Sequence, residues 1–356
     1  MLNKPKAQSA GEGAAAIQAG GSANNAVINQ TNNYGMTVDD VRAVAQDAFR
    51  ADFVQLLGQA GDIAEARANR VVERYLDRLQ AENPAGLSQA NTPDFRYALF
   101  TAQKAQARSG DENLEELLVE LLIERSRESQ RNLQQIVLNE ALEVVSRLTD
   151  EQIAALTISF IIRRTVNNTI FAFPNFLAAM DEQVQPFIKQ GKLSVASFSH
   201  LAFTGCGVVE MGQISLSDCF IHTYPELWQS PFHNDDPVVQ QLNPAARQFI
   251  IPSMHAPGML EVFGGVKETS ARMRESLLPD PMLRAPLDQL LSRPRLSPDQ
   301  VKERCIVARP YMTELFDLWN DTSMKHFNPS SVGIAIAHAN LIRRVPNFGP
   351  LSVWIN

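Results

Sequence analysis

Two groups of side chains in this sequence have the chemistry to bind a metal ion or to transfer a proton. The first group is His200, Cys206, Cys219 and His222, whose thiols and imidazoles are ligand types of structural zinc. Cys219 and His222 have a ligand-like separation, but His200 and Cys206 lack the spacing of a zinc knuckle. Because a buried cysteine also packs as a small hydrophobic residue, we favour a structural role for both cysteines.

The second group is His233, Asp235 and Asp236, which lie just before Pro237. An imidazole and two carboxylates in a polar loop could bind a divalent ion or perform general acid–base catalysis. The same residues are typical of a helix N-terminus, with an aspartate cap and proline at the first helical position. We favour the capping interpretation. The sequence therefore predicts no metal site, no cofactor and no catalytic residue.

A further histidine, His338, lies in the apolar segment Ile-Ala-His-Ala-Asn, close to Asn340. A catalytic role and a core position are both compatible with this pattern. We favour a hydrogen-bonded histidine in the protein core, because the surrounding residues predict a buried helix.

The elements that must position these residues divide the 356-residue chain into three predicted parts. Residues 1–36 form a low-complexity Gly/Asn/Ala tail, residues 37–190 a helical domain, and residues 191–356 a Pro-rich domain. All six His, all three Cys, all three Trp and 15 of the 20 Pro follow residue 190. We predict a mainly α fold, with one very long helix in the N-terminal half and a few short strands in the α-rich C-terminal half.

The predicted long helix begins near Thr37 and its apolar period continues to Glu82. Two helices that meet at Gly58 and Gly61 are the alternative, since an interior glycine costs about 1 kcal/mol relative to alanine. The apolar residues keep the same helical spacing on both sides of these glycines. We therefore favour a single helix of about 45 residues, roughly 65 Å long. Such a helix could serve as a stalk or a dimer seam.

Later elements are indicated by local signals. Four capping residues are predicted to begin helices: Thr92, Thr149, Ser297 and Ser330. The acidic run at 111–124 could form a cation site, but its spacing fits a solvated helix face better, and we favour that interpretation. A helix is also predicted over residues 235–250, and the alternation at 351–355 predicts a short strand.

Short apolar segments in the tail suggest self-association. They lie between Gly and Asn residues, and Gln and Asn ladders favour the stacking of strands from several copies. A disordered tail is the simpler interpretation of the same composition, and stacking is the alternative to it. The predicted oligomerisation residues come from the tail and the long helix: Ile17, Val27, Ile28, Val41, Phe49, Phe53 and Leu57.

The charge distribution disfavours several classes of partner. The net charge is −7, and residues 1–190 contain 18 basic and 24 acidic residues. No large basic surface is therefore expected, which makes nucleic-acid binding unlikely, although a small local patch could escape this averaging. No apolar run approaches the roughly 18 residues of a membrane span. Three cysteines and no signal-like N-terminus favour the cytoplasm.

Three stretches resemble an uncharacterised bacterial family that is known by locus-tag names. They are the opening Gln8-Ser9 with Ile17-Gln18-Ala19-Gly20-Gly21, the segment Phe95-Arg96-Tyr97-Ala98-Leu99-Phe100-Thr101, and the C-terminal Ser331-Val332-Gly333-Ile334-Ala335-Ile336-Ala337-His338-Ala339-Asn340 with Trp354-Ile355-Asn356. The resemblance implies a cytosolic, mainly helical protein without an assigned activity. Similar Gly/Asn-rich tails occur on bacterial proteins associated with conflict or anti-phage roles.

Two functions remain open at this point. The first is a self-associating cytoplasmic scaffold or sensor-type interaction protein that binds itself and another protein, without enzymatic activity. The second is a metal-dependent, hydrolase-like effector in the C-terminal half, which would use one of the two groups described above.

Overall fold

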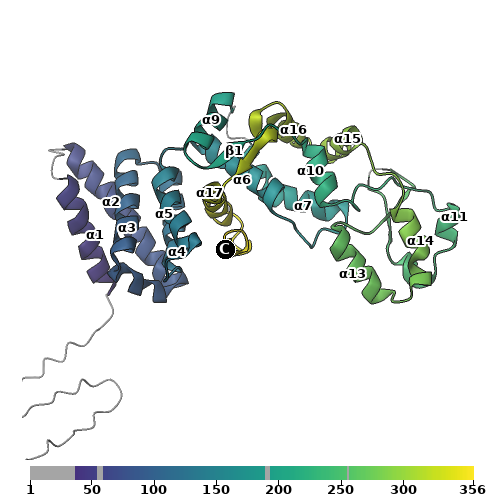
Figure 1. Ribbon diagram of the computed structural model, residues 1–356, viewed down its shortest axis with the longest axis horizontal. Helices are drawn as coiled ribbons and strands as arrows, with labels where there is room; N and C mark the ends of the chain where they lie inside the picture. Colours follow the sequence, from purple (N-terminus) through teal and green to yellow (C-terminus); the bar gives the residue numbers. More distant parts are fainter. Residues whose placement is uncertain (1–36, 54–58, 189–192, 255) are drawn as a thin grey trace, which may run out of the picture. The chain divides into compact units, whose positions relative to one another are not determined.

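The N-terminal part of the described chain consists of helices that pack side by side. A computed structural model describes residues 37–53, 59–188, 193–254 and 256–356. The first helices in chain order are α1 (Val38–Phe53), α2 (Gln59–Glu82), the 3-10 helix η1 (Pro84–Asn91), α3 (Pro93–Ser109), α4 (Glu112–Ser126) and α5 (Leu133–Val145). They form the group of helices at the N-terminal end of the described chain in Figure 1.

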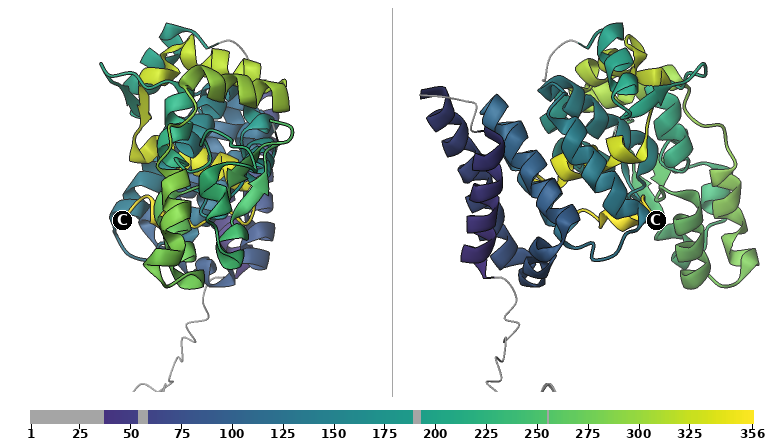
Figure 2. Two further views of the ribbon diagram at one scale, coloured as in Figure 1. Left: turned by 90° about the vertical axis from the view of Figure 1, so that its right-hand side faces the viewer. Right: turned by 60° about the vertical axis from the view of Figure 1, so that its left-hand side comes forward.

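The prediction of one very long helix is wrong. α1 ends at Phe53 and α2 begins at Gln59, and the two helices lie antiparallel beside each other (Figure 2). Arg42 on α1 forms an ion pair with Glu73 on α2, with 2.6 Å between its Nε and the carboxylate oxygen. The pairing buries the apolar faces of both helices against each other and α3, which a single extended helix could not do.

The middle of the chain continues with short helices and one strand. These elements are α6 (Asp150–Arg164), α7 (Phe173–Gln183), α8 (Gln185–Ile188), α9 (Val195–Phe203), β1 (Gly207–Val209) and α10 (Leu216–Thr223). α6 is buried along nearly its whole length, from Gln152 to Ile162. It therefore forms a central element on which helices from both halves of the sequence pack.

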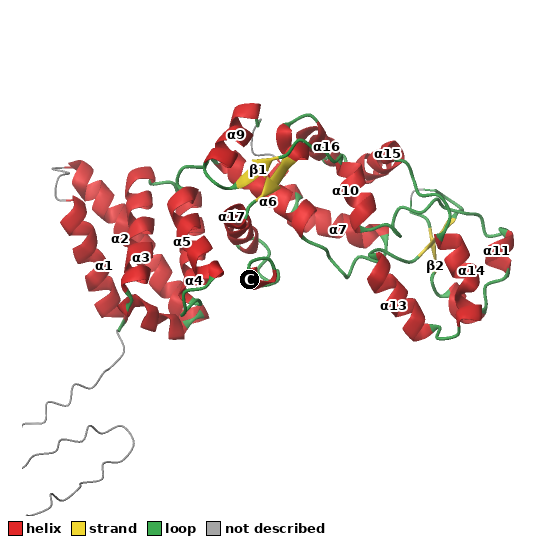
Figure 3. Ribbon diagram, viewed as in Figure 1, coloured by secondary structure: helices red, strands yellow, loops and turns green. Residues whose placement is uncertain are grey.

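The C-terminal part alternates short helices with loops, as Figure 3 shows. Its elements are α11 (Pro237–Gln240), α12 (Pro244–Arg247), β2 (Ile250–Pro252), β3 (Leu260–Val262), α13 (Lys267–Leu277), α14 (Pro281–Leu291), α15 (Pro298–Ala308), α16 (Met312–Asn320), η2 (Ser323–His326), β4 (Phe327–Pro329), α17 (Ser331–Ile342) and η3 (Leu351–Val353). A mainly α fold with a few short strands is thus confirmed.

Two local predictions differ from the structure. The helix predicted over residues 235–250 is interrupted, because Asn243 ends one segment and caps the next, α12, through a hydrogen bond from the Ala246 amide. The strand predicted at 351–355 is instead the 3-10 helix η3. Leu351 in η3 and Ile355 just after it are buried, whereas Val353 between them is 61% exposed, and the segment belongs to neither of the two strand pairs of the described residues.

The strands form two small antiparallel pairs. β1 pairs with β4, with Gly207 opposite Pro329, and β2 pairs with β3, with Ile250 opposite Val262. β4 directly precedes α17 in the chain, and its pairing with β1 anchors this segment. It therefore helps to fix the position at which α17 begins.

α17, near the C-terminus, packs against helices from the N-terminal half of the sequence. It packs against α4, α5 and α6, and ten successive residues, Val332–Leu341, are buried. One hydrophobic core runs from Val41 to Ile355, and a smaller core beneath α11, α12 and α14 includes Phe232, Val238 and Leu287. The contacts group Met36–Asn356 into one compact unit, and the domain boundary predicted at residue 190 lies inside it. Among the described residues, no helix is both long and apolar enough to cross a bilayer.

Candidate binding cleft

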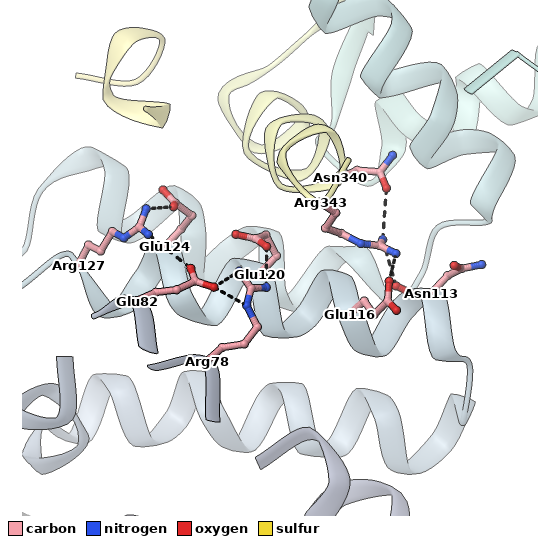
Figure 4. Close-up of polar contacts among 9 residues, drawn as sticks. All are labelled: Arg78, Glu82, Asn113, Glu116, Glu120, Glu124, Arg127, Asn340 and Arg343. Atoms are coloured by element: carbon pink, nitrogen blue, oxygen red, sulfur yellow. Dashed lines mark hydrogen bonds and ion pairs between the residues drawn. The ribbon is translucent and has the colours of Figure 1, made fainter. Parts of the chain in front are cut away.

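A cleft of about 670 Å³ lies between α2, α4 and the segment that begins in α17 and continues to Pro350. One side is strongly charged and the other is largely apolar. Figure 4 shows the charged side, where arginines from α2 and α17 meet glutamates from α4. The cleft combines two parts of the sequence, residues 74–127 and residues 338–350, that are more than 200 positions apart.

The charged side begins as a ladder of ion pairs between α2 and α4. Arg78 on α2 contacts two carboxylates, Glu82 at 2.8 Å and Glu120 at 2.7 Å. Arg127, just after α4, contacts Glu124 and lies 3.8 Å from Glu82. Residues four apart on a helix lie on one face, so each turn of α2 meets a turn of α4 with the opposite charge.

The ladder continues beyond the cleft at Glu115, whose side chain is fully buried. Arg70 and Arg74 on α2 contact its two carboxylate oxygens at 2.6 and 2.9 Å, and Gln106 on α3 donates a hydrogen bond to it. A buried carboxylate requires such partners to offset its lost hydration. The expectation of a solvated glutamate face on residues 112–124 is therefore wrong for Glu115, and also for Glu120 and Glu124, which are buried.

Glu124 is a member of the ladder whose acidity is perturbed by its surroundings. Burial raises the pKa of its carboxyl group, and the nearby carboxylates Glu120 and Glu82 add to the effect, whereas Arg127 opposes it. The cleft thus contains more carboxylates than its arginines neutralise at this end. This arrangement favours a cationic group over an anionic one.

A second set of polar contacts holds α17 against α4. Arg343 places a guanidinium nitrogen 2.5 Å from Glu116 and donates to the carbonyl oxygen of Asn113 and to the side chain of Asn340, both at 3.3 Å (Figure 4). Asn340 in turn donates to the hydroxyl of Thr157 on α6 at 2.9 Å. The Glu116 side chain is 53% exposed, so solvent or another cation can reach this carboxylate.

The apolar side of the cleft is built around His338. Its Nε2 lies 2.8 Å from the carbonyl oxygen of Gly349, and its ring packs between Phe160, Phe348 and Trp354. Burial lowers the pKa of His338, which favours the neutral ring. Because a carbonyl oxygen can only accept, the contact with Gly349 requires the proton on Nε2. Nδ1 has no hydrogen-bond partner among the described residues. The predicted core position is confirmed, but only one ring nitrogen is satisfied.

The first predicted metal group is not assembled. His200 Nδ1 lies 3.1 Å from the Gln152 amide nitrogen, and His222 Nδ1 contacts the Asp218 carbonyl oxygen of its own helix. Cys206 and Cys219 are buried, and burial raises the pKa of Cys219 to about 11. Within the described ranges, no three His, Cys, Asp or Glu side chains are placed to hold a metal ion.

The second predicted group forms a helix cap. Asp236 accepts a hydrogen bond from the Val238 amide at the start of α11 and a paired contact from Arg293 at 2.7 and 2.9 Å. The hydrogen bonds from Arg293, then from the Val238 amide, lower the pKa of Asp236. His233 takes part only through its carbonyl oxygen, which accepts from the Asp236 amide, so the structure does not join His233, Asp235 and Asp236 into a reactive site.

The predicted oligomerisation residues divide into two sets. Val41 and Phe49 are each 2% exposed and pack inside this chain, Phe49 against Ala64, Ala68 and Ala107. Neither is available to a second copy in this structure. The others lie outside the residues whose side chains the structure describes: Ile17, Val27, Ile28, Phe53 and Leu57.

Sequence reasoning did not find the cleft. A signal for its charged side was present, because Arg70, Arg74 and Arg78 recur every four residues and match the glutamate spacing on α4. No comparable signal links this pattern to Arg343, whose position depends on how α17 packs.

Comparisons with known proteins give one match. A protein-family model whose description reads “:-like” matches residues 35–355. Searches of the curated proteins and of the solved structures gave no significant match.

Proposed function

Because the chain belongs to the uncharacterised “:-like” family, whose model spans residues 35–355, we propose a function from the site alone: a self-associating interaction protein without enzymatic activity. The cleft between α2, α4 and α17 binds a segment of a partner protein. Residues 1–36 promote assembly of several copies.

The observation that carries this proposal is the Arg343–Glu116 pair in the cleft, in which the Glu116 side chain is 53% exposed and the Arg343 side chain is 15% exposed. Because more than half of the Glu116 side chain is exposed, a partner cation can contact this carboxylate beside Arg343 and compete with it. Phe348 and Pro350 provide apolar surface in the same cleft. The partner segment that fits is therefore basic, with an aromatic or aliphatic side chain next to its cation.

Competition for Glu116 would also transmit the effect of partner binding to other parts of the molecule. Arg343 and Asn340 link α17 to both α4 and α6. A partner that binds Glu116 loosens one of these links, which is a local change of the kind a sensor needs.

Partner binding can be tested with labelled synthetic peptides and the full chain. A peptide that alternates Arg with Phe should bind, and its acidic counterpart with Glu in place of Arg should not. Glu116→Gln should weaken binding at least about fivefold, corresponding to roughly 1 kcal/mol. Glu65→Gln, which removes the Arg50 partner between α1 and α2 at a distance from the cleft, is the matched control. Equal binding by all three proteins would contradict the proposal.

Self-association requires a separate measurement. The mass of the full chain in solution should exceed that of one copy at micromolar concentration, and deletion of residues 1–36 should reduce it. A monomer that is unchanged by the deletion would exclude this part of the proposal without affecting the cleft.

A further inference from the structure

A second groove, of about 590 Å³, lies between α3 and α5 and shares no residue with the cleft. Its α3 side is a single stripe of Tyr97, Phe100, Lys104 and Arg108. These residues are three or four positions apart and therefore lie on one helix face. Arg147, just after α5, faces them across the groove.

The aromatic residues of this stripe are not explained by core packing. The buried face of α3 consists of other residues, among them Phe95, Leu99 and Ala102. Tyr97 is 61% exposed, and Phe100 is only partly buried. The Lys104 ammonium lies over the Phe100 ring, 5.9 Å from its centroid. Two rings are thus available one turn apart at the surface.

The groove is basic in a chain that is acidic overall. Lys104, Arg108 and Arg147 line it together with one carboxylate, Glu143. All four side chains are exposed. Among the described residues, neither Arg108 nor Arg147 has a carboxylate within ion-pair distance, unlike Arg70, Arg74 and Arg78 of α2. The net charge of −7 therefore conceals a local positive site.

We propose that the α3–α5 groove binds a short stretch of single-stranded nucleic acid. Bases stack on Tyr97 and Phe100, and phosphates contact Arg108 and Arg147. Surface aromatics combined with cations along a groove are the features by which proteins bind single strands without sequence preference. The stripe from Tyr97 to Arg108 covers about 16 Å at 1.5 Å per residue, which suits a few nucleotides and not a long tract.

Other occupants fit less well. Residues 1–36 contain Lys4 and Lys6 but one acidic residue, Glu12, so this segment does not complement a basic groove. The same groove on a second copy has the same charge and is repelled. An acidic peptide would satisfy the cations, but it would not require two exposed flat rings.

The test is fluorescence anisotropy of a labelled short oligothymidylate with the full chain at ~50 mM salt, where a contact with few phosphates is strongest. Tyr97→Ala should weaken binding at least about fivefold, and Tyr97→Trp should preserve it, because stacking needs only a ring. Arg147→Ala should weaken binding and reduce the slope of log K against log salt by about 0.7.

Matched controls are Phe203→Ala, which removes an aromatic side chain that is 88% exposed on α9, and Arg272→Ala on α13, which removes an exposed cation. Both should bind the oligonucleotide like the wild type. All four positions are exposed, so unchanged thermal unfolding is expected and confirms that the variants fold.

Two results would overturn the proposal. The first is no oligonucleotide binding, or binding that Tyr97→Ala and Arg147→Ala leave unchanged. The second is displacement of the oligonucleotide by polyglutamate with equal affinity, combined with sensitivity to Arg147→Ala but not to Tyr97→Ala. That combination would identify the groove as a site for an acidic protein segment.

Discussion

At the scale of single residues, His338 is a buried neutral group whose protonation opposes folding. Burial, and to a smaller extent Arg127, lowers its pKa in the folded state below the ordinary value of 6.5, although the contact with the Gly349 carbonyl oxygen acts in the opposite direction. Between these two pKa values the unfolded chain binds more protons than the folded chain. The free energy of unfolding therefore rises with pH in that window and falls as the pH drops through 6.5.

We expect His338→Gln to reduce this part of the pH dependence. Glutamine can still donate to Gly349 but does not titrate. Urea unfolding between about pH 5 and pH 7.5 should show a smaller decrease in stability at low pH for the variant than for the wild type. Parallel curves for the two proteins would show that His338 does not contribute.

Gly333 illustrates a different constraint on a single position. It lies in the first turn of α17, where an added Cβ would be 1.9 Å from the carbonyl oxygen of Cys206. That oxygen belongs to the backbone and also accepts from the Ser330 amide, so it cannot move independently. The close approach of α17 to the segment before β1 therefore requires glycine.

Gly333→Ala should lower the free energy of unfolding by about 1–3 kcal/mol through overpacking. Gly212→Ala is the control, since a Cβ at Gly212 meets no atom within 4 Å. Chemical denaturation of both variants compares the two sites. A similar small effect for both would mean that α17 shifts without cost.

At the scale of elements, the α2–α4 interface combines apolar packing with ion pairs of very different exposure. Glu115 is fully buried, whereas its partners Arg70 and Arg74 are 43% and 44% exposed. Solvent therefore stabilises the arginines if the Glu115 carboxylate is removed. The resulting loss in the free energy of unfolding comes mainly from the buried hydrogen bonds.

Glu115→Gln should lower the free energy of unfolding by about 1–3 kcal/mol. Glu65→Gln, at the more exposed Arg50–Glu65 pair, should change it by less than about 1 kcal/mol. Denaturant unfolding gives both values. Equal effects would indicate that burial does not distinguish these pairs.

The same elements show what the sequence can predict. The caps at Thr92, Thr149, Ser297 and Ser330 all begin helices as predicted, because capping depends on residues three or four positions apart. The break between α1 and α2 and the burial of Glu115 depend on pairing across 30 or more residues, which periodicity does not contain. The cleft combines residues 74–127 with residues 338–350, so no local pattern could predict it.

At the scale of the whole molecule, the described halves share one core. α17 packs against an apolar surface formed by α4, α5 and α6. Trp354 packs on Phe160 and donates a hydrogen bond to the Arg164 carbonyl oxygen. Separation of the chain at residue 190 would expose this apolar surface to solvent. The three-part domain division proposed from composition therefore does not imply three independently folding parts.

We expect residues 37–190 alone to bind a hydrophobic dye and to unfold without a sharp transition, while residues 37–356 unfold cooperatively. Circular dichroism and dye fluorescence distinguish the two states. Co-expression with residues 191–356 should restore the cooperative transition. A sharp transition without dye binding for the short fragment would show that the helical half folds alone.

The position of α17 in the sequence also imposes an order in time on the ribosome. α6 is complete when Arg164 has been synthesised, but α17 begins only at Ser331. At about 5–20 residues per second, the interval is on the order of 10–30 s. During this interval the apolar surface of α4, α5 and α6 is exposed on the nascent chain and accessible to chaperones and proteases. Protection of this surface before α17 is synthesised is therefore part of how the protein reaches its native state in the cell.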